Sequence, residues 1–562
     1  VVLARFHDDL GRRTYDIDRD TYRVLTGLEG ELTFANIDWE IFYQYGESHE
    51  ARTDQNNRHS RRFRLATDVT TDANGNPACR ATVEAVQPTF DRDIDTCVPL
   101  NIFGVGLASQ AAKDYVLVDL VNRAKLTQHV AGATLSGELF ELPGGRMGFA
   151  GGAEFRRETS DFQPDSLFVQ GAVFDGQLLP VMGKYEVLEG YLEVRAPILA
   201  DLPGAKLLSI EGGVRISDYD SIGNTTSWRG ALEWAPVADL RLRGGVARAV
   251  RAPNVGELFS PVRQSFAGIL DPCDRLNVGL GPNPAQRLAN CTAQLAPLGL
   301  NPTTFNDPQR GVTKRIIVGG NPELAEETAD STTIGLVFTP RFLKGFSAAI
   351  DAFDIEIEDA IEAPQFQQIV NDCYDRFEST ANEFCGLFER VAGDALNGVI
   401  RNVRATQLNI AALETKGIDF TLRQIFDLGG RFGDVLNLSL VGTYLDEANF
   451  LPASNAADID VVAGELLAPR VRGVLDVNYG NGPLTLGWRL RYIGEAVFDR
   501  EEDPVEVRSP QEASAHPISD IQMRYRFGQQ PRFDLYLGVN NVFDRDPPSI
   551  ARAGATGAGF SP

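Results

Sequence analysis

Apolar and charged residues alternate along residues 146–156 with the two-residue period of a β-strand. Phe149 and Phe155 stand at odd positions, which are otherwise Met, Gly or Ala, whereas Glu154 and Arg156 stand at even positions. Successive side chains of a strand point to opposite faces of a sheet, so one face here is apolar and the other is charged. The segment therefore predicts a strand that separates two different environments.

The same alternation recurs in segments 187–196, 205–217, 228–234 and 484–492. Each segment places Leu, Ile, Val or Trp at one parity and its Arg and Glu at the other. In a membrane-spanning strand, a charge facing lipid costs roughly 2–4 kcal/mol at the bilayer midplane, so the charged parity would line the interior. The alternative is the solvated surface of a soluble sheet.

Turn signals group the strands into hairpins. Pro143-Gly144-Gly145 is one example, and we expect others at Gly30-Glu31, at Leu428-Gly429-Gly430 and at Gly528-Gln529-Gln530. About sixteen strands follow from alternation and turns together, most of them long enough to cross a bilayer when tilted. The expected strands are 15–28, 37–48, 123–142, 146–159, 186–197, 205–219, 224–235, 240–250, 330–339, 345–357, 406–424, 434–446, 471–479, 483–493, 516–527 and 532–542.

Connections between the hairpins are much longer than the turns within them. Segment 49–120 is one, and a second of about 80 residues follows residue 250; structureless loops beyond about 15 residues are uncommon in compact domains. Short turns on one side and long loops on the other are typical of a transmembrane β-barrel with periplasmic turns and extracellular loops. We therefore predict an all-β fold, a transmembrane antiparallel β-barrel in which lipid covers the apolar face. Six aromatic residues are candidates for its interfacial girdles: Trp39, Tyr43, Trp228, Trp234, Trp488 and Tyr492.

The composition of the chain restricts the classes of partner that the protein can bind. The 562 residues contain 77 acidic and 53 basic side chains, a net charge of −24, which argues against nucleic acid. No apolar run approaches the roughly 20 residues of a membrane helix. No signal peptide opens the sequence at Val1, which for an exported protein suggests a fragment.

We find no catalytic, cofactor or metal motif. The five histidines are scattered, and neither a Gly-x-Ser-x-Gly elbow nor an Asp-x-Asp-x-Asp-Gly loop occurs. The acidic residues between Asp351 and Glu362 alternate with Phe353, Ile355 and Ile357, as expected for a strand end. We therefore predict that the protein is not an enzyme.

Six cysteines lie in the polar connections. Proximity pairs Cys79 with Cys97, Cys273 with Cys291, and Cys373 with Cys385, although six cysteines allow 15 pairings. Disulfides imply an oxidising compartment, and each loop of about 12–18 residues would contribute roughly 3 kcal/mol. Unpaired thiols are the alternative.

Three motifs resemble those of TonB-dependent receptors. Residues 248–261 contain the first, residues 320–329 the second, and Leu537–Asp544 is similar to the penultimate-strand ending of that family. The order and spacing of the three agree with the family along essentially the whole chain. The matching positions of the first two motifs are Arg251, Ala252, Pro253, Asn254, Glu257, Leu258, Asn321, Pro322, Leu324 and Glu327.

The resemblance implies a twenty-two-stranded outer-membrane barrel of a Gram-negative bacterium, with a plug domain in its lumen. Residues 1–562 would then be a partial barrel domain that lacks the plug, the first strands and the last strand. Ten charged lumen residues are candidates to contact the plug, or else pair with one another along the wall. They are Glu154, Arg156, Glu189, Arg195, Glu211, Arg215, Arg229, Glu233, Arg241 and Arg243.

The resemblance also implies the activity: energised uptake of a scarce nutrient, such as a siderophore, vitamin or saccharide, into the periplasm. Its partners would be outer-membrane lipid, the TonB complex through the missing N-terminal region, and the nutrient; we expect a monomer. The main alternative is a passive, porin-like diffusion channel, with an outer-membrane enzyme or a surface adhesin as more distant ones. Loop aromatics such as Phe259, Phe266, Phe305, Tyr374 and Phe377 either stack on the nutrient or pack within the loops.

Overall fold

The structure is a computed structural model. It describes residues 9–33, 36–85, 90–174, 177–393, 395–430, 433–451, 459–498, 500, 512–527 and 533–548. The predicted turn at Gly528-Gln529-Gln530 and the segment after residue 548 lie outside these ranges.

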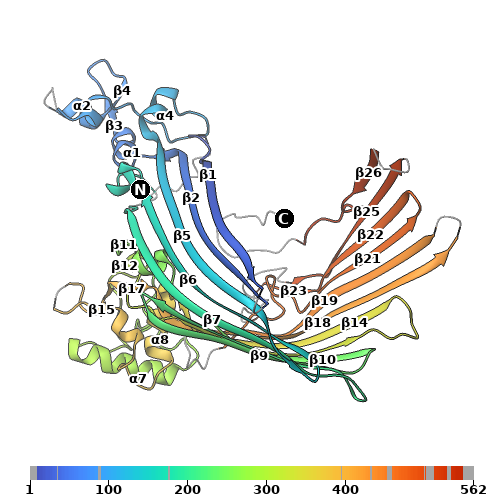
Figure 1. The fold of residues 1–562 in the computed structure, drawn as a ribbon. Coiled ribbons are helices and arrows are strands. Elements are labelled where there is room, and N and C mark those ends of the chain that lie inside the picture. The colour runs from blue at the N-terminus through green and yellow to red at the C-terminus, as the bar shows by residue number, and fades with distance from the viewer. Residues whose placement is uncertain are drawn as a thin grey trace.

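Seventeen strands form one antiparallel sheet, which curls into the deep trough seen in Figure 1. The two-residue β20 (Asp460–Val461) pairs only with the end of β19, and each of the other strands pairs with its neighbours in chain order. Among the described residues, β1 and β26 each pair on one side only, and Figure 1 shows the trough open between them. The long strands, in order, are β1 (Thr14–Leu32), β2 (Ile37–Arg58), β5 (Leu117–Leu142), β6 (Gly145–Gln163), β7 (Val181–Leu202), β8 (Ala205–Tyr219), β9 (Gly223–Val237), β10 (Leu240–Arg251), β13 (Glu327–Phe338), β14 (Phe346–Glu362), β18 (Leu408–Gly429), β19 (Asp434–Leu451), β21 (Val471–Asn481), β22 (Leu484–Ile493), β25 (His516–Phe527) and β26 (Phe533–Val539).

These strands confirm the all-β antiparallel prediction, but the first turn was wrong. β1 runs through Gly30 and Glu31 to Leu32, and the turn falls just before Ile37. Gly30 lies opposite Trp39, where a Cβ atom would stand 2.9 Å from the indole ring. The glycine is therefore required inside the strand, to make room for the Trp39 side chain, and does not mark its end.

The register gives the sheet two different faces. On the apolar face, large side chains such as Leu188, Ile216 and Ile334 are 58%, 55% and 68% exposed, so no protein core covers them. The six girdle candidates Trp39, Tyr43, Trp228, Trp234, Trp488 and Tyr492 all lie on this face. We call the opposite face, which carries the alternating charges, the polar face.

The connections confirm the predicted asymmetry, because every long one lies on the same side. Residues 143–144, 203–204, 238–239 and 482–483 are turns on the other side. One connection on the loop side is also short: only residues 220–222 join β8 to β9.

The longest connections are folded segments with cores of their own. Residues 59–116 contain α1 (Ser60–Thr67), α2 (Arg80–Glu84), α3 (Arg92–Asp95), α4 (Gln110–Val116) and the hairpin of β3 (Val69–Thr71) and β4 (Pro77–Cys79). The connection from β6 to β7 contains α5 (Ser166–Val169), and β23 (Ala496–Val497) pairs with β24 (Glu512–Ala513) between β22 and β25.

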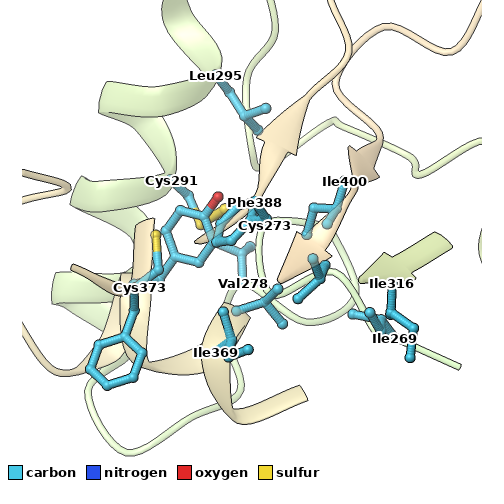
Figure 2. Packing of buried hydrophobic residues seen from close by; sticks show 14 of the residues in the cluster. Ile269, Cys273, Val278, Cys291, Leu295, Ile316, Ile369, Cys373, Phe388 and Ile400 are labelled. Carbon is cyan, nitrogen blue, oxygen red and sulfur yellow. A yellow bond between two sulfur atoms is a disulfide. The ribbon is translucent and has the colours of Figure 1, made fainter. Parts of the chain in front are cut away.

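Two connections, residues 260–319 and 363–407, fold together into what we call the loop module. Its elements are β11 (Arg263–Ala267), α7 (Pro284–Leu295), the 3-10 turn Ala296–Leu298, β12 (Lys314–Gly319), α8 (Phe366–Asp375), the 3-10 turn Phe384–Leu387, β15 (Glu389–Arg390), β16 (Ile400–Arg401) and β17 (Val403–Thr406). β12 joins the two connections, pairing with β11 on one side and with β17 on the other. Figure 2 shows the core, where Leu295 of α7 and Ile369 of α8 pack around Cys273, Cys291 and Cys373.

Candidate functional site

The two signature segments found in the sequence meet at Arg251, the last residue of β10. Its partner in the sheet register is Glu327, the first residue of β13. The Arg251 guanidinium donates to both carboxylate oxygens of Glu327, with Nη2 2.7 Å from Oε1, and to both oxygens of Glu257 at 3.1 Å. One cation therefore bridges two carboxylates from segments about 70 residues apart; we call this three-residue cluster the Arg251 junction.

Glu257 belongs to α6 (Val255–Phe259), a short helix that follows directly on Arg251, Ala252 and Pro253. Asn254 caps the helix, because its Oδ1 accepts from the backbone N–H groups of Gly256 and Glu257 at 2.8 and 3.0 Å. The Glu257 carboxylate accepts from the Asn254 N–H at 2.7 Å, which completes a capping box. Glu257 thus holds both the helix start and Arg251.

The second signature segment binds the C-terminal half of α6. The Asn321 N–H donates to the Glu257 carbonyl oxygen at 2.8 Å, and its side-chain amide donates to the Gln407 carbonyl oxygen at 3.1 Å. Leu258 and Leu324 are both buried, whereas Pro322 is exposed. A Cβ on Gly320 would stand 2.7 Å from the Glu257 carbonyl oxygen, so only glycine permits this approach.

The other side of α6 packs on the polar face of β7. A Cβ at Gly183 would lie 2.5 Å from Val255 Cγ1 and 2.6 Å from Phe259 Cδ2. The helix therefore lies within the trough, against the wall, at the loop side of the sheet.

Two pockets flank α6, and Gly256 lines both. We name them after one residue of each: the Phe162 pocket has a volume of about 490 Å³ and the Arg23 pocket about 600 Å³. Both volumes lie within the range of small-molecule sites.

A chain of hydrogen bonds crosses the wall of the Arg23 pocket. Arg23 of β1 donates to Gln44 of β2, and the Gln44 amide donates to Gln128 of β5 at 2.9 Å. Gln128 in turn donates to Glu158 of β6 at 2.9 Å. Tyr185 of β7 also lines the pocket. Polar groups from five successive strands are thus held in one row.

All ten charged residues predicted to line the lumen lie on the polar face, and each forms an ion pair there. A single pair with both partners exposed contributes at most about 1 kcal/mol, whereas Glu189, with its side chain 5% exposed, is a buried partner. The pairs are Glu154–Arg156 (3.8 Å), Glu189–Arg215 (3.2 Å), Arg195–Glu211 (3.2 Å), Arg229–Glu193 (3.2 Å), Arg241–Glu233 (2.8 Å) and Arg243–Asp351 (2.6 Å). Pairing along the wall, the alternative from the sequence, is what the structure contains, and contact with a plug stays a prediction.

The predicted cysteine pairs are confirmed as disulfides. The bonds join Cys79 to Cys97, Cys273 to Cys291, and Cys373 to Cys385. The second and third of these disulfides cross-link the loop module, which lies beside α6.

Buried polar groups also hold the loop module together. Arg390 donates to Asp271 at 2.7 and 2.8 Å and to the Tyr374 hydroxyl at 2.8 and 2.9 Å. Burial raises the pKa of the Tyr374 phenol, so it stays protonated. Burial opposes ionisation of Asp274, but Arg310 and two backbone N–H groups outweigh it and lower the pKa of this carboxyl.

Three of the five loop aromatics pack within the loop module, and stacking on a nutrient stays a prediction. Phe305 and Tyr374 are buried in the module core, which confirms packing for both, and Phe377 packs against that core. Phe266 is exposed, and Phe259 packs on Gly183.

Sequence reasoning missed the residues that surround α6. Alternation does not show that Arg23, Gln44 and Gln128 lie at the same height along the sheet. That height depends on the register between strands, which a single sequence does not reveal. Phe162 and Gly183 gave no local signal either. The signature segments identified Arg251, Glu257 and Glu327 as residues, but not the contacts that join them.

Within the described ranges, no three His, Cys, Asp or Glu side chains are grouped to hold a metal ion. None of the helices in the described part of the chain combines the length and the apolar composition that crossing a bilayer requires.

Comparison with known families gives one match that covers nearly the whole chain. The family model described as "TonB dependent receptor-like, beta-barrel" matches residues 3–542. A comparison with curated proteins gave no match.

Solved structures of similar fold include receptors from two bacteria. One is a mutant ferric enterobactin receptor (PfeA) of Pseudomonas aeruginosa in complex with enterobactin, at 16% identity and a TM-score of 0.56, covering 95% of this chain and 58% of the receptor. Another is the siderophore receptor PirA of Acinetobacter baumannii, at 14% identity and a TM-score of 0.53, covering 95% of this chain and 59% of that one. At these identities the likeness establishes the fold, and the chain spans less than two thirds of the length of either receptor.

Proposed function

The chain belongs to the TonB-dependent receptor-like β-barrel family, and from this premise we propose that it forms the barrel of an outer-membrane receptor for energised nutrient uptake. The nutrient would be a scarce small molecule such as a siderophore, a vitamin or a saccharide. The family is one of receptors and transporters, and no enzymatic step is part of the proposal.

Each part of the molecule has a role in this proposal. The exposed apolar face would contact outer-membrane lipid, and the paired charges of the polar face would meet a plug domain in the lumen. The folded connections on the loop side would face the outside of the cell and bind the nutrient. The three disulfides support an oxidising compartment.

The observation that carries the proposal is the Arg251 junction. Two separate family motifs would have no reason to adjoin in a generic barrel, yet here Arg251, Glu257 and Glu327 bond to one another. The junction joins β10 to β13, the two strands that flank the first connection of the loop module. This supports a receptor, whose loops must be held in place, over a passive channel.

We also propose that residues 1–562 are part of a longer receptor, which would include a plug domain, a TonB-contacting segment and further strands. The 58% and 59% coverage of the two receptors supports this, as does the single-sided pairing of β1 and β26 within the described part of the chain. Sequencing the coding region on both sides tests it. An intact gene limited to these 562 codons would contradict it.

Uptake measurements distinguish the receptor from the passive channel. The full gene would be expressed in a host without its own receptors, with tonB intact or deleted, and supplied with radiolabelled ferric siderophores and cobalamin. We expect accumulation of one of these nutrients only when tonB is intact. Equal accumulation in both hosts would identify a passive channel.

A further inference from the structure

The two pockets beside α6 are adjacent, because Gly256 lines both. We propose that together they form one subsite for an amphipathic organic anion, with a ring in the Phe162 pocket and hydroxyl and carboxylate oxygens in the Arg23 pocket. The proposal rests on the proposed receptor function, since it names the chemical class of nutrient that such a receptor would bind at this wall.

The Phe162 pocket fits a ring. Phe162 of β6, Val181 of β7 and Phe366 of α8 line it, so the wall and the loop module contribute its opposite sides. Ser260, Gln365 and Gln407 add polar groups, and the other side chains that line the pocket are apolar. Ligand sites of this size typically combine such apolar walls with a few hydrogen-bonding groups, and aromatic side chains favour rings.

The Arg23 pocket fits oxygen atoms. The Gln44 and Gln128 amides are oriented by their mutual hydrogen bond, and each retains further donor or acceptor capacity toward the pocket. Amide rows of this kind suit hydroxyl groups, which both donate and accept. The carbon stems of the same side chains supply the remaining surface.

The charge balance of the pocket favours an anion. Two carboxylates line the pocket, and both are engaged within the wall. Glu47 is paired with Lys125 at 3.2 Å and with His49, and Glu158 accepts from Gln128 and lies 3.6 Å from the Arg156 guanidinium. Arg23 donates to the neutral Gln44 and forms no ion pair among the described residues. An uncompensated guanidinium prefers a carboxylate, which it binds through parallel hydrogen bonds.

Three related compounds test both halves of the subsite on the full gene product purified in detergent. 4-Methylumbelliferyl β-D-glucuronide carries a ring, hydroxyls and a carboxylate; the corresponding glucoside lacks the carboxylate, and D-glucuronate lacks the ring. We expect the glucuronide to bind about tenfold more tightly than the glucoside, the difference one charge-assisted bond provides. Fluorescence anisotropy measures both, and competition measures D-glucuronate, which should bind most weakly.

Two variants test which residues form each half of the subsite, the Arg23 pocket and the Phe162 pocket. Arg23→Gln should weaken the glucuronide about tenfold and leave the glucoside unchanged, and Phe162→Ala should weaken both. Arg19→Gln, on the same face of β1 but paired with Glu50, and Phe155→Ala, on the apolar face of β6, are matched controls that should change neither.

Equal binding of glucuronide and glucoside, or unchanged binding in both variants, would overturn the subsite. Either result leaves the proposed function intact if nutrient uptake still requires tonB. Conversely, binding with the expected variant pattern supports the subsite even if uptake proves independent of tonB, which overturns only the receptor function.

Discussion

Arg251 is bonded to two carboxylates that are themselves largely shielded, with side chains only 16% and 14% exposed at Glu257 and Glu327. Removing the guanidinium leaves two neighbouring negative charges without a counterion, which should cost about 2–4 kcal/mol of local stability. We therefore expect Arg251→Ala to release α6, seen as faster amide hydrogen exchange in residues 254–260. Arg248→Ala, which breaks a pair with Asp330 on the other face of the same strand, is the control. Unchanged exchange in Arg251→Ala would contradict the role of the junction.

Gly183 of β7 leaves the space into which the same helix, α6, packs. Any side chain there would collide with α6, because its Cβ atom would lie 2.5 Å from Val255 Cγ1 and 2.6 Å from Phe259 Cδ2. Gly183→Ala should therefore displace α6 and increase protease cleavage near residue 257. Gly190→Ala in the same strand, where the nearest atom is 4.0 Å from a Cβ, should leave cleavage at the native rate. Equal cleavage of the two variants would show that α6 does not depend on this contact.

At the residue scale, the sequence was informative where chemistry is local. The signature positions Asn254 and Glu257 and the paired cysteines were found from residues close in the chain. Arg23 and Glu158 line one pocket only because the register brings distant strands level, and no motif records that register.

At the element scale, strands were predicted well because each carries its own evidence, alternation within it and a turn beside it. β8 and β25 begin and end where they were expected. The turn at Gly30 was misplaced because a glycine that accommodates Trp39 resembles a glycine that makes a turn. The loop module escaped prediction as a folded unit, since its core joins residues from two connections about 100 positions apart.

The loop module should lose stability in acid. The Asp274 carboxylate, 1% exposed, accepts from Arg310 and from the Asp307 and Leu276 N–H groups. Its pKa is lower in the folded protein than in the unfolded chain, so its contribution is complete above about pH 4 and is lost as the pH falls further. Hydrogen exchange of residues 271–310 should accelerate below that pH.

An Asn at this position removes the charge at every pH. We expect Asp274→Asn to destabilise the module by about 2–3 kcal/mol at neutral pH and to reduce its acid dependence. Asp68→Asn, at an exposed pair with Arg80, is the control. Identical acid profiles for Asp274→Asn and the native protein would refute this account.

At the scale of the whole molecule, the two faces of the sheet determine where the protein can reside. An Arg at Ile210 would place a charge on the apolar face, at a cost of about 2–4 kcal/mol near the midplane of a bilayer. The folded fraction of Ile210→Arg in lipid vesicles should fall accordingly, as measured by heat-dependent mobility in gels. Gly213→Arg, on the polar face beside the Glu193–Arg229 pair, should fold as the native protein does. Equal folding of the two variants would argue against a lipid-facing surface.

The central claim is that one parity of each strand faces lipid and the other faces the lumen. A nitroxide scan of residues 207–217 in β8 tests it most directly, in the full gene product reconstituted into lipid vesicles. All six cysteines of residues 1–562 are in disulfides, so none of them competes with the introduced cysteine for the label. We predict that collisions with oxygen peak at the even positions, Leu208 to Ile216, and that collisions with a water-soluble nickel chelate peak at the odd ones. Uniform access of the nickel chelate at both parities would contradict the account.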